Sequence, residues 1–489
     1  MEALRGVGAP DRTVAGVSVR VRAMALAVAW GLGLAGCGGG GGGNGNVKST
    51  PPATTPPPIV NPPPSGGSTP SDRNIDVAAS AVTGLPDTVS GALNLIKGGA
   101  GTLNLTGNNS YTGKTMVNAG SLYVNGDQSA ATGATTVASG ATLGGNGTLG
   151  GDVTVADGGT LAPGAQGAIG TLAIKGSLSL SSGSLLTFDF GQISGGTQAS
   201  DLVNVKGNLI LDGTLNVAVP SGGDLGPGVH RLFNYGGALV DNGLTLGTMP
   251  SNGWAVQTGV ANQVNLIDTR GMSFSFWDGD AGPKSNNVID GGDGTWNAGT
   301  SNTSWTDASG AINAPYSNGS FAVFQGTPGT VTVSDANGIV AATGMQFASY
   351  GYVIQGDGIH LVGSTADPTH SIIRVGDGTA DGALYKATIN SALDGTTTLV
   401  KTDSGTLALA GNNTYSGGTT VSGGTLQIGD GGTTGWVLGD VTDNASLAFN
   451  RSDNVIYNGV VSGSGALLQV GTGKLILNGS NTYTGGTFV

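Results

Sequence analysis

The chain has 489 residues, of which 93 are glycine and 19 are proline, and only 10% are charged. Glycine does not recur at every third position, which excludes collagen, and each glycine would cost a helix about 1 kcal/mol, which argues against a helical bundle. The net charge of −12 argues against a nucleic-acid partner, because such a partner attracts clusters of lysine and arginine. Apolar residues make up 38% of the chain and recur regularly, so the composition indicates strands joined by turns rather than disorder.

Residues 1–36 are predicted to be a secretory signal peptide. Two arginines precede an apolar stretch at 23–34, which is too short to span a membrane but suits the core of a signal peptide. The stretch ends in Leu-Ala-Gly-Cys, which resembles the lipobox of bacterial lipoproteins and implies that Cys37 is the site of lipid attachment. The alternative is ordinary signal cleavage near Ala35, with Cys37 incidental.

Residues 37–74 are predicted to be a disordered, lipid-anchored linker rich in glycine and proline. Six consecutive glycines follow Cys37, and a proline-rich run comes next. Glycine makes a flexible tether and proline a stiffer, extended one, so no core can form here. A lipid on Cys37 would hold the chain at a membrane, and the lipoprotein sorting rule, which considers the residue after the cysteine, implies the outer membrane because that residue is Gly38.

A sequence motif recurs three times between the linker and the end of the chain. Its pattern is Gly-x-Leu-x-Leu-x-Gly-x-Asn-Ser/Thr-Tyr-Thr/Ser-Gly, and in the third copy Lys and Ile occupy the first two variable positions. Spacing and residue type agree over about 24 positions in the first two copies, which is a strong repeat signal. The matching positions are Gly101, Leu103, Leu105, Tyr111 and Gly113; Gly405, Leu407, Leu409, Tyr415 and Gly417; and Gly473, Leu475, Leu477, Tyr483 and Gly485.

Each repeat contains three short strands and three turns. Leu103 and Leu105 alternate with polar residues and therefore share one face of a strand. Gly107 begins a Gly-Asn-Asn turn, and Leu122 and Val124 alternate again in a third strand. One coil of a β-solenoid has this composition, and coils must stack because one alone cannot bury its apolar face. At roughly 22 residues per coil, residues 75–489 would form about 19 coils and a rod about 90 Å long.

The motif resembles the passenger-associated β-strand repeat of bacterial autotransporters. This resemblance implies an all-β, right-handed parallel β-helix that is exported through its own C-terminal outer-membrane barrel and displayed on the cell surface. We expect a β-helix passenger segment at 75–270, a Trp-containing passenger module with further β-helix coils at 271–400, and truncated β-strand repeats at 401–489.

The expected C-terminal translocator barrel is absent from this sequence. A membrane barrel needs many alternating strands of about ten residues with aromatic girdles, and none precedes Val489. We therefore interpret the chain as an N-terminal piece of a longer passenger or as the product of an interrupted gene. The second case would make it a non-exported remnant in the periplasm.

No catalytic residue, cofactor or metal site is predicted. The three histidines, His230, His360 and His370, lie outside protease motifs, and His360 is expected to be an outward-facing strand residue. The aspartate pairs lie beside glycines and are interpreted as turn residues that bond their own backbone, with a glycan-active enzyme as the alternative. These pairs are Asp278 with Asp280 and Asp290 with Asp293.

A cluster of aromatic residues lies in the middle of the chain: Trp277, Trp296, Trp305, Phe321 and Phe324. We interpret these residues as the packing of a loop-rich module against the β-helix, and the alternative is an exposed platform that binds glycan.

Together these features predict a non-enzymatic, surface-exposed passenger segment. Its β-helix would present loops to a host-cell receptor, to a glycan or to neighbouring cells. By the same resemblance, folding of one coil after another outside the membrane would aid export.

Overall fold

The computed structural model describes residues 71–489, apart from 166, 192–197 and 220–225. The predicted signal peptide, Cys37 and nearly all of the predicted linker lie outside the described residues. The first strand, β1 (Ser71–Asp76), begins slightly earlier than the predicted β-helix start at Ile75. Its polar, mostly exposed side chains gave no alternation to detect, and it is instead defined by backbone pairing, in which Ser71 opposes Leu93.

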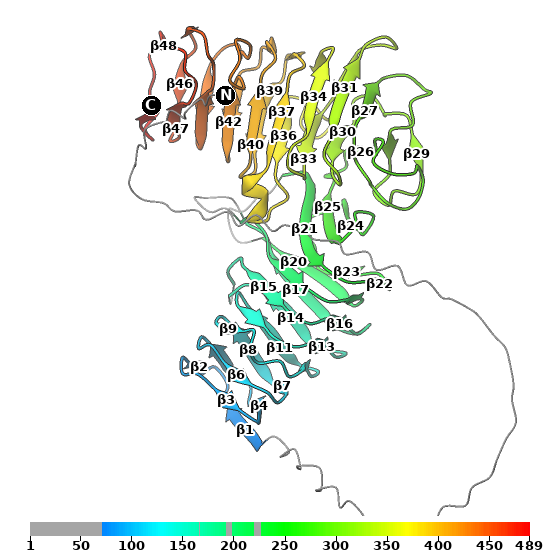
Figure 1. Ribbon diagram of the computed structural model, residues 1–489, viewed down its shortest axis with the longest axis vertical. Helices are drawn as coiled ribbons and strands as arrows, with labels where there is room; N and C mark the ends of the chain where they lie inside the picture. Colours follow the sequence, from blue (N-terminus) through cyan, green and yellow to red (C-terminus); the bar gives the residue numbers. More distant parts are fainter. Residues whose placement is uncertain (1–70, 166, 192–197, 220–225) are drawn as a thin grey trace, which may run out of the picture. The chain divides into compact units, whose positions relative to one another are not determined.

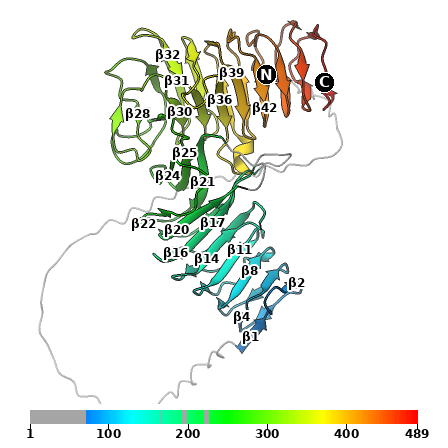
Figure 2. The same ribbon diagram turned by 180° about the vertical axis from the view of Figure 1, so that it is seen from behind.

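The described residues form an all-β protein, which confirms the predicted fold class of a parallel β-helix. No α-helix occurs among them, and one short 3-10 helix, η1, spans Asp381–Leu384. Figures 1 and 2 show two stacks of strands, one from β1 to β23 and one from β26 to β49, and within each stack successive strands lie side by side. We call residues 71–270 the N-terminal stack and residues 271–489 the C-terminal stack.

Three sheets, parallel except at one end of the third, form the faces of the N-terminal stack. The first contains β1, β4 (Leu93–Gly98), β7 (Thr115–Val117), β10 (Thr135–Val137), β13 (Val153–Val155), β16 (Leu178–Leu180), β19 (Leu209–Leu211) and β22 (Leu239–Asp241). The second contains β2 (Val82–Leu85), β5 (Thr102–Leu105), β8 (Gly120–Val124), β11 (Ala141–Gly145), β14 (Thr160–Pro163), β17 (Leu185–Asp189), β20 (Thr214–Ala218) and β23 (Thr245–Leu246). The third contains β9 (Asp127–Gln128), β12 (Thr148–Leu149), β15 (Thr171–Ile174), β18 (Leu202–Val205) and β21 (Gly228–Tyr235), and β3 (Ser90–Gly91) pairs with β6 (Ser110–Tyr111).

The C-terminal stack repeats this arrangement. One sheet contains β26 (Phe274–Trp277), β30 (Phe321–Phe324), β33 (Gly344–Phe347), β36 (His370–Val375), β39 (Thr398–Thr402), β41 (Thr419–Val421), β43 (Val441–Asp443) and β46 (Val461–Ser462). A second contains β27 (Gly294–Asn297), β31 (Thr330–Ser334), β34 (Val353–Gly356), β37 (Lys386–Ile389), β40 (Thr406–Leu409), β42 (Thr425–Ile428), β44 (Ser446–Phe449), β47 (Ala466–Gln469) and β49 (Thr487–Phe488). Two smaller sheets contain β32 (Val340–Ala342), β35 (Ile359–Leu361) and β38 (Leu393–Gly395), and β45 (Val455–Tyr457) and β48 (Leu475–Leu477).

A continuous ladder of leucines fills the centre of the N-terminal stack. Successive coils place these leucines directly opposite one another, and every one is fully buried: Leu103, Leu122, Leu143, Leu161, Leu186 and Leu215. Burial of each leucine side chain contributes about 1.5–3 kcal/mol before entropy losses. The apolar alternation read from the sequence is therefore what stacks one coil on the next.

The strands do not form the single uninterrupted rod that uniform coils predict. β21 pairs antiparallel with β25 (Gln263–Asp268), which pairs antiparallel with β24 (Trp254–Gln257). The C-terminal stack begins with a second antiparallel group, in which β28 (Trp305–Thr306) lies between β26 and β29 (Asn313–Ala314). Coil lengths also vary, since paired positions are 19 residues apart at Thr102 and Ser121 and 31 apart at Thr214 and Thr245.

Candidate functional site

The repeat motif is the candidate functional element, and its leucines build the core of the first two copies. Leu103 and Leu105 lie on β5, and their side chains are fully buried. Leu407 and Leu409 lie on β40 and are also fully buried. In the third copy the same positions form β48, where they are half-buried. The leucines of the third copy also lie on a different face of the coil, because β48 pairs with β45 and does not belong to the sheet that contains β40.

The motif tyrosine makes the same contact in all three copies. The hydroxyl of Tyr111 lies 2.6 Å from that of Thr115, and the hydroxyl of Tyr415 lies 2.8 Å from that of Thr419. In the third copy, the hydroxyl of Tyr483 lies 2.6 Å from that of the equivalent threonine. Burial raises the pKa of Tyr111 and of Tyr415. The first two rings are therefore buried anchors of the coil rather than exposed binding groups.

The motif glycine that follows the tyrosine lies where two coils approach closely. A Cβ atom on Gly113 would lie 2.1 Å from the carbonyl oxygen of Leu93, and one on Gly485 would lie 2.4 Å from that of Gly465. At Gly417 the nearest atom, the carbonyl carbon of Thr397, would be 2.3 Å away. Glycine is required here by the spacing between coils.

An asparagine in the motif, which the sequence reasoning treated only as a turn residue, connects neighbouring coils. The side-chain oxygen of Asn109 accepts the backbone N–H of Val89 at 2.5 Å, and that of Asn413 accepts the N–H of Leu393 at 2.8 Å. The third copy repeats the bond at 2.7 Å, from the N–H of Val461 to Asn481. Each bond joins the asparagine to a residue 20 positions earlier, so the asparagine fixes the register of its coil on the preceding coil.

Sequence reasoning also missed a buried lysine before the motif. Lys97 and Lys401 each lie four positions before the first motif glycine, and a shared offset is the signal that could have identified them. Both side chains are fully buried. Lys97 donates to the carbonyls of Gly98, Gly99 and Ala119 at 2.7–2.9 Å, and Lys401 makes the equivalent three bonds. Burial lowers the pKa of Lys97, and it lowers that of Lys401 to about 7, with Asp403 opposing the shift.

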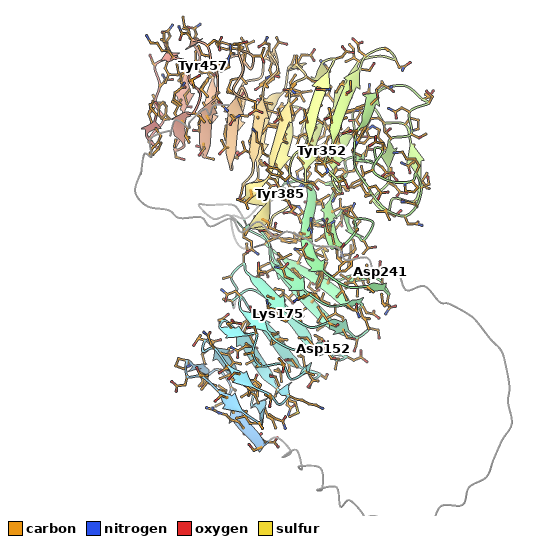
Figure 3. The ribbon with its side chains drawn as sticks, viewed as in Figure 1. Asp152, Lys175, Asp241, Tyr352, Tyr385 and Tyr457 are labelled. Carbon is orange, nitrogen blue, oxygen red and sulfur yellow. The ribbon has the colours of Figure 1, made fainter. Side chains whose placement is uncertain are left out.

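Tyrosine and aspartate side chains connect coils elsewhere in both stacks (Figure 3). Tyr352 donates its hydroxyl to carbonyls of the preceding coil at 2.6 and 2.8 Å, and Tyr457 donates to that of Gly439 at 2.6 Å. Asp152 accepts the backbone N–H of Ser177 at 2.7 Å. These polar groups are thus committed to holding coils together.

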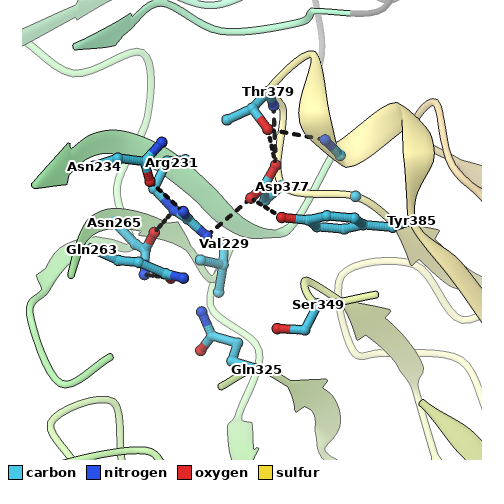
Figure 4. A network of polar contacts seen from close by, with 12 residues as sticks. Val229, Arg231, Asn234, Gln263, Asn265, Gln325, Ser349, Asp377, Thr379 and Tyr385 are labelled. Carbon is cyan, nitrogen blue, oxygen red and sulfur yellow. Dashed lines mark hydrogen bonds and ion pairs between the residues drawn. The ribbon is translucent and has the colours of Figure 1, made fainter. Parts of the chain in front are cut away.

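A buried polar network joins the two stacks (Figure 4). Arg231 on β21 forms an ion pair with Asp377, which follows β36, at 3.0 Å, and both side chains are at most 6% exposed. Arg231 also donates to Asn265 at 2.7 Å and to Asn234 at 2.6 Å. Asp377 accepts the backbone N–H and hydroxyl of Thr379. Each charge therefore has an opposite charge and further hydrogen bonds, as burial requires.

A second buried arginine reinforces the same junction. Arg374 on β36 donates to Asp403 at 2.9 Å and to the carbonyl of Pro227 at 2.8 Å. Its guanidinium nitrogens lie 3.4 Å from the ring nitrogens of His230, which is fully buried. Burial and the neighbouring Arg374 charge hold the pKa of His230 well below its usual value. The side chain of Gln346 adds reciprocal hydrogen bonds to the backbone of Val229 at 2.7 and 2.8 Å.

The other histidines lie on the surface. His360 is on β35 with its ring 45% exposed, which confirms that it is an outward-facing strand residue, and it lies 2.5 Å from Asp394. His370 pairs with Asp367 at 2.9 Å. Among the described residues, no three His, Cys, Asp or Glu side chains are grouped to hold a metal ion.

The aspartate pairs serve the loops around them. Asp278 accepts the backbone N–H of Asp290 at 3.0 Å, and Asp280 accepts that of Asp293 at 2.8 Å. Asp293 in turn accepts the N–H of Thr330 at 2.6 Å. The aspartates do bond backbone groups, but not those of their own turns as predicted, because the N–H groups that Asp278, Asp280 and Asp293 accept lie 12, 13 and 37 residues away.

The aromatic cluster is a core. All three tryptophans and both phenylalanines are at most 1% exposed, and Trp277 donates its indole N–H to the carbonyl of Gly292 at 2.9 Å. Trp296 and Trp305 pack edge to face with their ring centroids 5.2 Å apart. The packing interpretation is confirmed, and these buried rings offer no platform on which a glycan could stack.

Comparison with known proteins agrees with this architecture. A family model described as a passenger-associated transport repeat matches residues 95–124, 399–428 and 467–489, which contain the three motif copies. The chain is also 51% identical over 448 residues to the Adhesin BmaC autotransporter of Brucella suis biovar 1 (strain 1330). That match covers 83% of this chain but only 12% of the relative. Both findings support an autotransporter passenger. Within the described part of the chain, we find no helix with the length and apolar character needed to span a membrane.

Proposed function

We propose that this chain is a surface-exposed segment of an autotransporter passenger that acts in adhesion. The observation that carries the proposal is the repeated coil of the passenger-associated family, in which the motif residues bond one coil to the next. The similarity to a protein named as an adhesin supports the adhesive role. The partner would be a host-cell receptor or glycan, or a neighbouring cell.

The proposed role is not enzymatic. The polar groups that could have formed a catalytic pair are used by the fold, since Asp278, Asp280 and Asp293 accept backbone N–H groups. His230 is buried at the junction against Arg374. We also propose that export benefits from folding, because each new coil gains its hydrogen bonds only by docking on the coil before it.

Adhesion can be tested directly with beads coated with the purified chain. Beads coated with this protein should attach to cultured epithelial cells several times more often than beads coated with serum albumin, which is also acidic. Soluble purified chain should compete for attachment. Equal attachment of both kinds of bead would overturn the proposed adhesive role.

We further propose a signal peptide at 1–36 and a lipid on Cys37 that anchors the chain to the outer membrane. The chain has one cysteine. Radioactive palmitate that a bacterial host attaches through the thioether or amide linkage of a lipoprotein therefore reports on Cys37 alone. The wild-type chain should be labelled and Cys37→Ser should not. Unlabelled wild-type protein would indicate ordinary signal cleavage instead.

A further inference from the structure

A cavity of about 580 Å³ lies at the end of the N-terminal stack, beside the β24–β25 hairpin. Its volume falls within the usual range of about 300–1,000 Å³ for small-molecule sites. The turn at 250–253 and the turn at 268–271 form two of its walls, and Phe190 and Trp254 supply aromatic surface. No motif residue and no residue of the Arg231–Asp377 pair lines it.

Trp254 is held as a fixed aromatic platform at this cavity. Its ring is stacked on Phe190 with the planes 12° apart and the centroids separated by 6.3 Å, and His230 lies at the same distance. The indole N–H donates to the hydroxyl of Ser251 at 3.0 Å. Because the N–H is already bonded and the ring is only partly buried, Trp254 presents mainly the π surface of its ring.

Two polar side chains, Asn252 and Arg270, lie on the turns beside that platform. Arg270 has a positive φ of 46°, and its backbone N–H and Nε both lie 3.1 Å from the carboxylate of Asp268. Asp268 lines the cavity but is only 2% exposed, and its carboxylate holds the arginine in place. On the opposite turn, Asn252 is exposed. A side-chain amide both donates and accepts hydrogen bonds, so Asn252 suits a ligand that carries adjacent hydroxyls.

The β24–β25 hairpin sets the distance between Trp254 and the turn at 268–271. Trp254 begins β24, Asp268 ends β25, and the two residues are direct partners in the antiparallel register. The backbone N–H and the hydroxyl of Thr269 both donate to the carbonyl of Gly253 at 2.9 Å, which ties the two turns together. A site built on paired strands needs little rearrangement when a ligand enters.

From this geometry we propose that the cavity binds one end of an oligosaccharide. A sugar ring has an apolar C–H face, which suits the π surface of Trp254, and an edge of adjacent hydroxyls, which suits the amide of Asn252. This inference rests on the proposed adhesive function and deepens it, because it assigns one class of ligand to one place in the fold.

The test uses the purified full chain and three immobilised probes: lactose, N,N′,N″-triacetylchitotriose and 3′-sialyllactose. The wild-type chain should bind at least one of them above a mannitol-coated surface, and Trp254→Ala should weaken that binding at least tenfold. Trp254→Phe should weaken it less, because it keeps a smaller ring. The matched control is Tyr350→Ala, which removes an aromatic side chain that is 61% exposed and lies outside the cavity, and this variant should bind as the wild type does.

Asn252→Ala covers the case in which Trp254→Ala does not fold, because Asn252 is exposed on a turn. It should weaken binding about threefold to tenfold and leave the thermal melting curve unchanged. Absence of binding to all three probes, or wild-type binding by folded Trp254 and Asn252 variants, would overturn the inference. The bead assay separates the two proposals: beads coated with the wild-type chain that adhere while the chain binds no probe would sink only the oligosaccharide site.

Discussion

The asparagine of the repeat motif bonds a backbone group one coil away, which is an unusual reach for a turn residue. In the second copy, Asn413 accepts the N–H of Leu393 and donates to the carbonyls of Gly411 and Trp436 at 3.1 and 2.8 Å. Asn413 is 1% exposed, so no water can replace these bonds. At the scale of single residues, coil stacking thus depends on polar side chains as well as on leucines.

Asn413→Ala should therefore destabilise the protein. The buried N–H of Leu393 would lose its acceptor, which costs about 1–3 kcal/mol. The matched control is Asn412→Ala, one position earlier, where the side chain is exposed and the change should stay within about 0.5 kcal/mol. Urea unfolding followed by circular dichroism measures both values, and equal effects of the two variants would contradict the proposed role of Asn413.

At the scale of strands and sheets, the buried ion pair between β21 and the segment after β36 connects the two stacks. We expect Arg231→Met and Asp377→Asn each to cost about 3–5 kcal/mol, because each leaves its partner buried without a counter-charge. The double variant should cost less than the sum of the two. The comparison pair is Lys386 and Asp430, about one-third exposed, where Lys386→Met should cost less than about 1 kcal/mol.

Unfolding free energies, summed over every transition in the urea curve, are measured for the two single variants and the double variant, and they give the coupling energy between Arg231 and Asp377. Strict additivity of the two substitutions would show that the pair contributes nothing beyond its separate hydrogen bonds.

The same junction should make the protein sensitive to acid. The pKa of His230 is well below 6.5 in the folded chain, because the ring is buried beside Arg374. As the pH falls below about 6.5, the unfolded chain therefore binds a proton that the folded chain does not, and the free energy of unfolding decreases. Between pH 7.5 and 5.0 this group should remove about 2 kcal/mol.

Comparison of variants isolates this effect from carboxyl groups that act in the opposite direction. Burial raises the pKa of Asp201 to about 8 and also raises that of Asp268, so these groups favour the folded state as the pH falls. His230→Gln should therefore lose stability less steeply on acidification than the wild type. Identical pH profiles for wild type and His230→Gln would contradict the assignment.

At the scale of the whole molecule, two large cores are joined by a small one. Separate clusters of buried side chains run through the N-terminal and C-terminal stacks, and a third, which includes Val229, Ile267 and Phe321, lies where they meet. Stability in stacked-coil proteins depends on contacts between neighbours. Loss of the junction should therefore uncouple the two stacks rather than unfold both together.

Asp377→Asn should unfold in two steps in urea. Four tryptophans of the described chain belong to the C-terminal stack and only Trp254 to the other, so fluorescence reports mainly on the C-terminal stack. Circular dichroism reports on the strands of both stacks. The two signals should coincide for the wild type and separate for the variant, and coincident curves for the variant would show that the stacks unfold as one unit without this ion pair.

The sequence alone determined the coil and its core. Alternation at Leu103 and Leu105 fixes which side chains point inward, because this period of two is a local property of an extended strand. The recurrence of the motif gave the stacking, and the burial confirmed it. The sequence also identified Asp280 as an aspartate that bonds backbone, although its partner, the N–H of Asp293, lies 13 residues away and was not predicted.

The tertiary structure alone decided where the stack is interrupted and how its two parts are joined. Arg231 and Asp377 lie far apart in the sequence, and their meeting depends on the summed lengths of many coils, which vary from one to the next. The acceptors of Lys97 and the partner of Asn413 likewise belong to neighbouring coils. Local patterns specify strands and turns, but such long-range partners follow only from the register in which the coils pack.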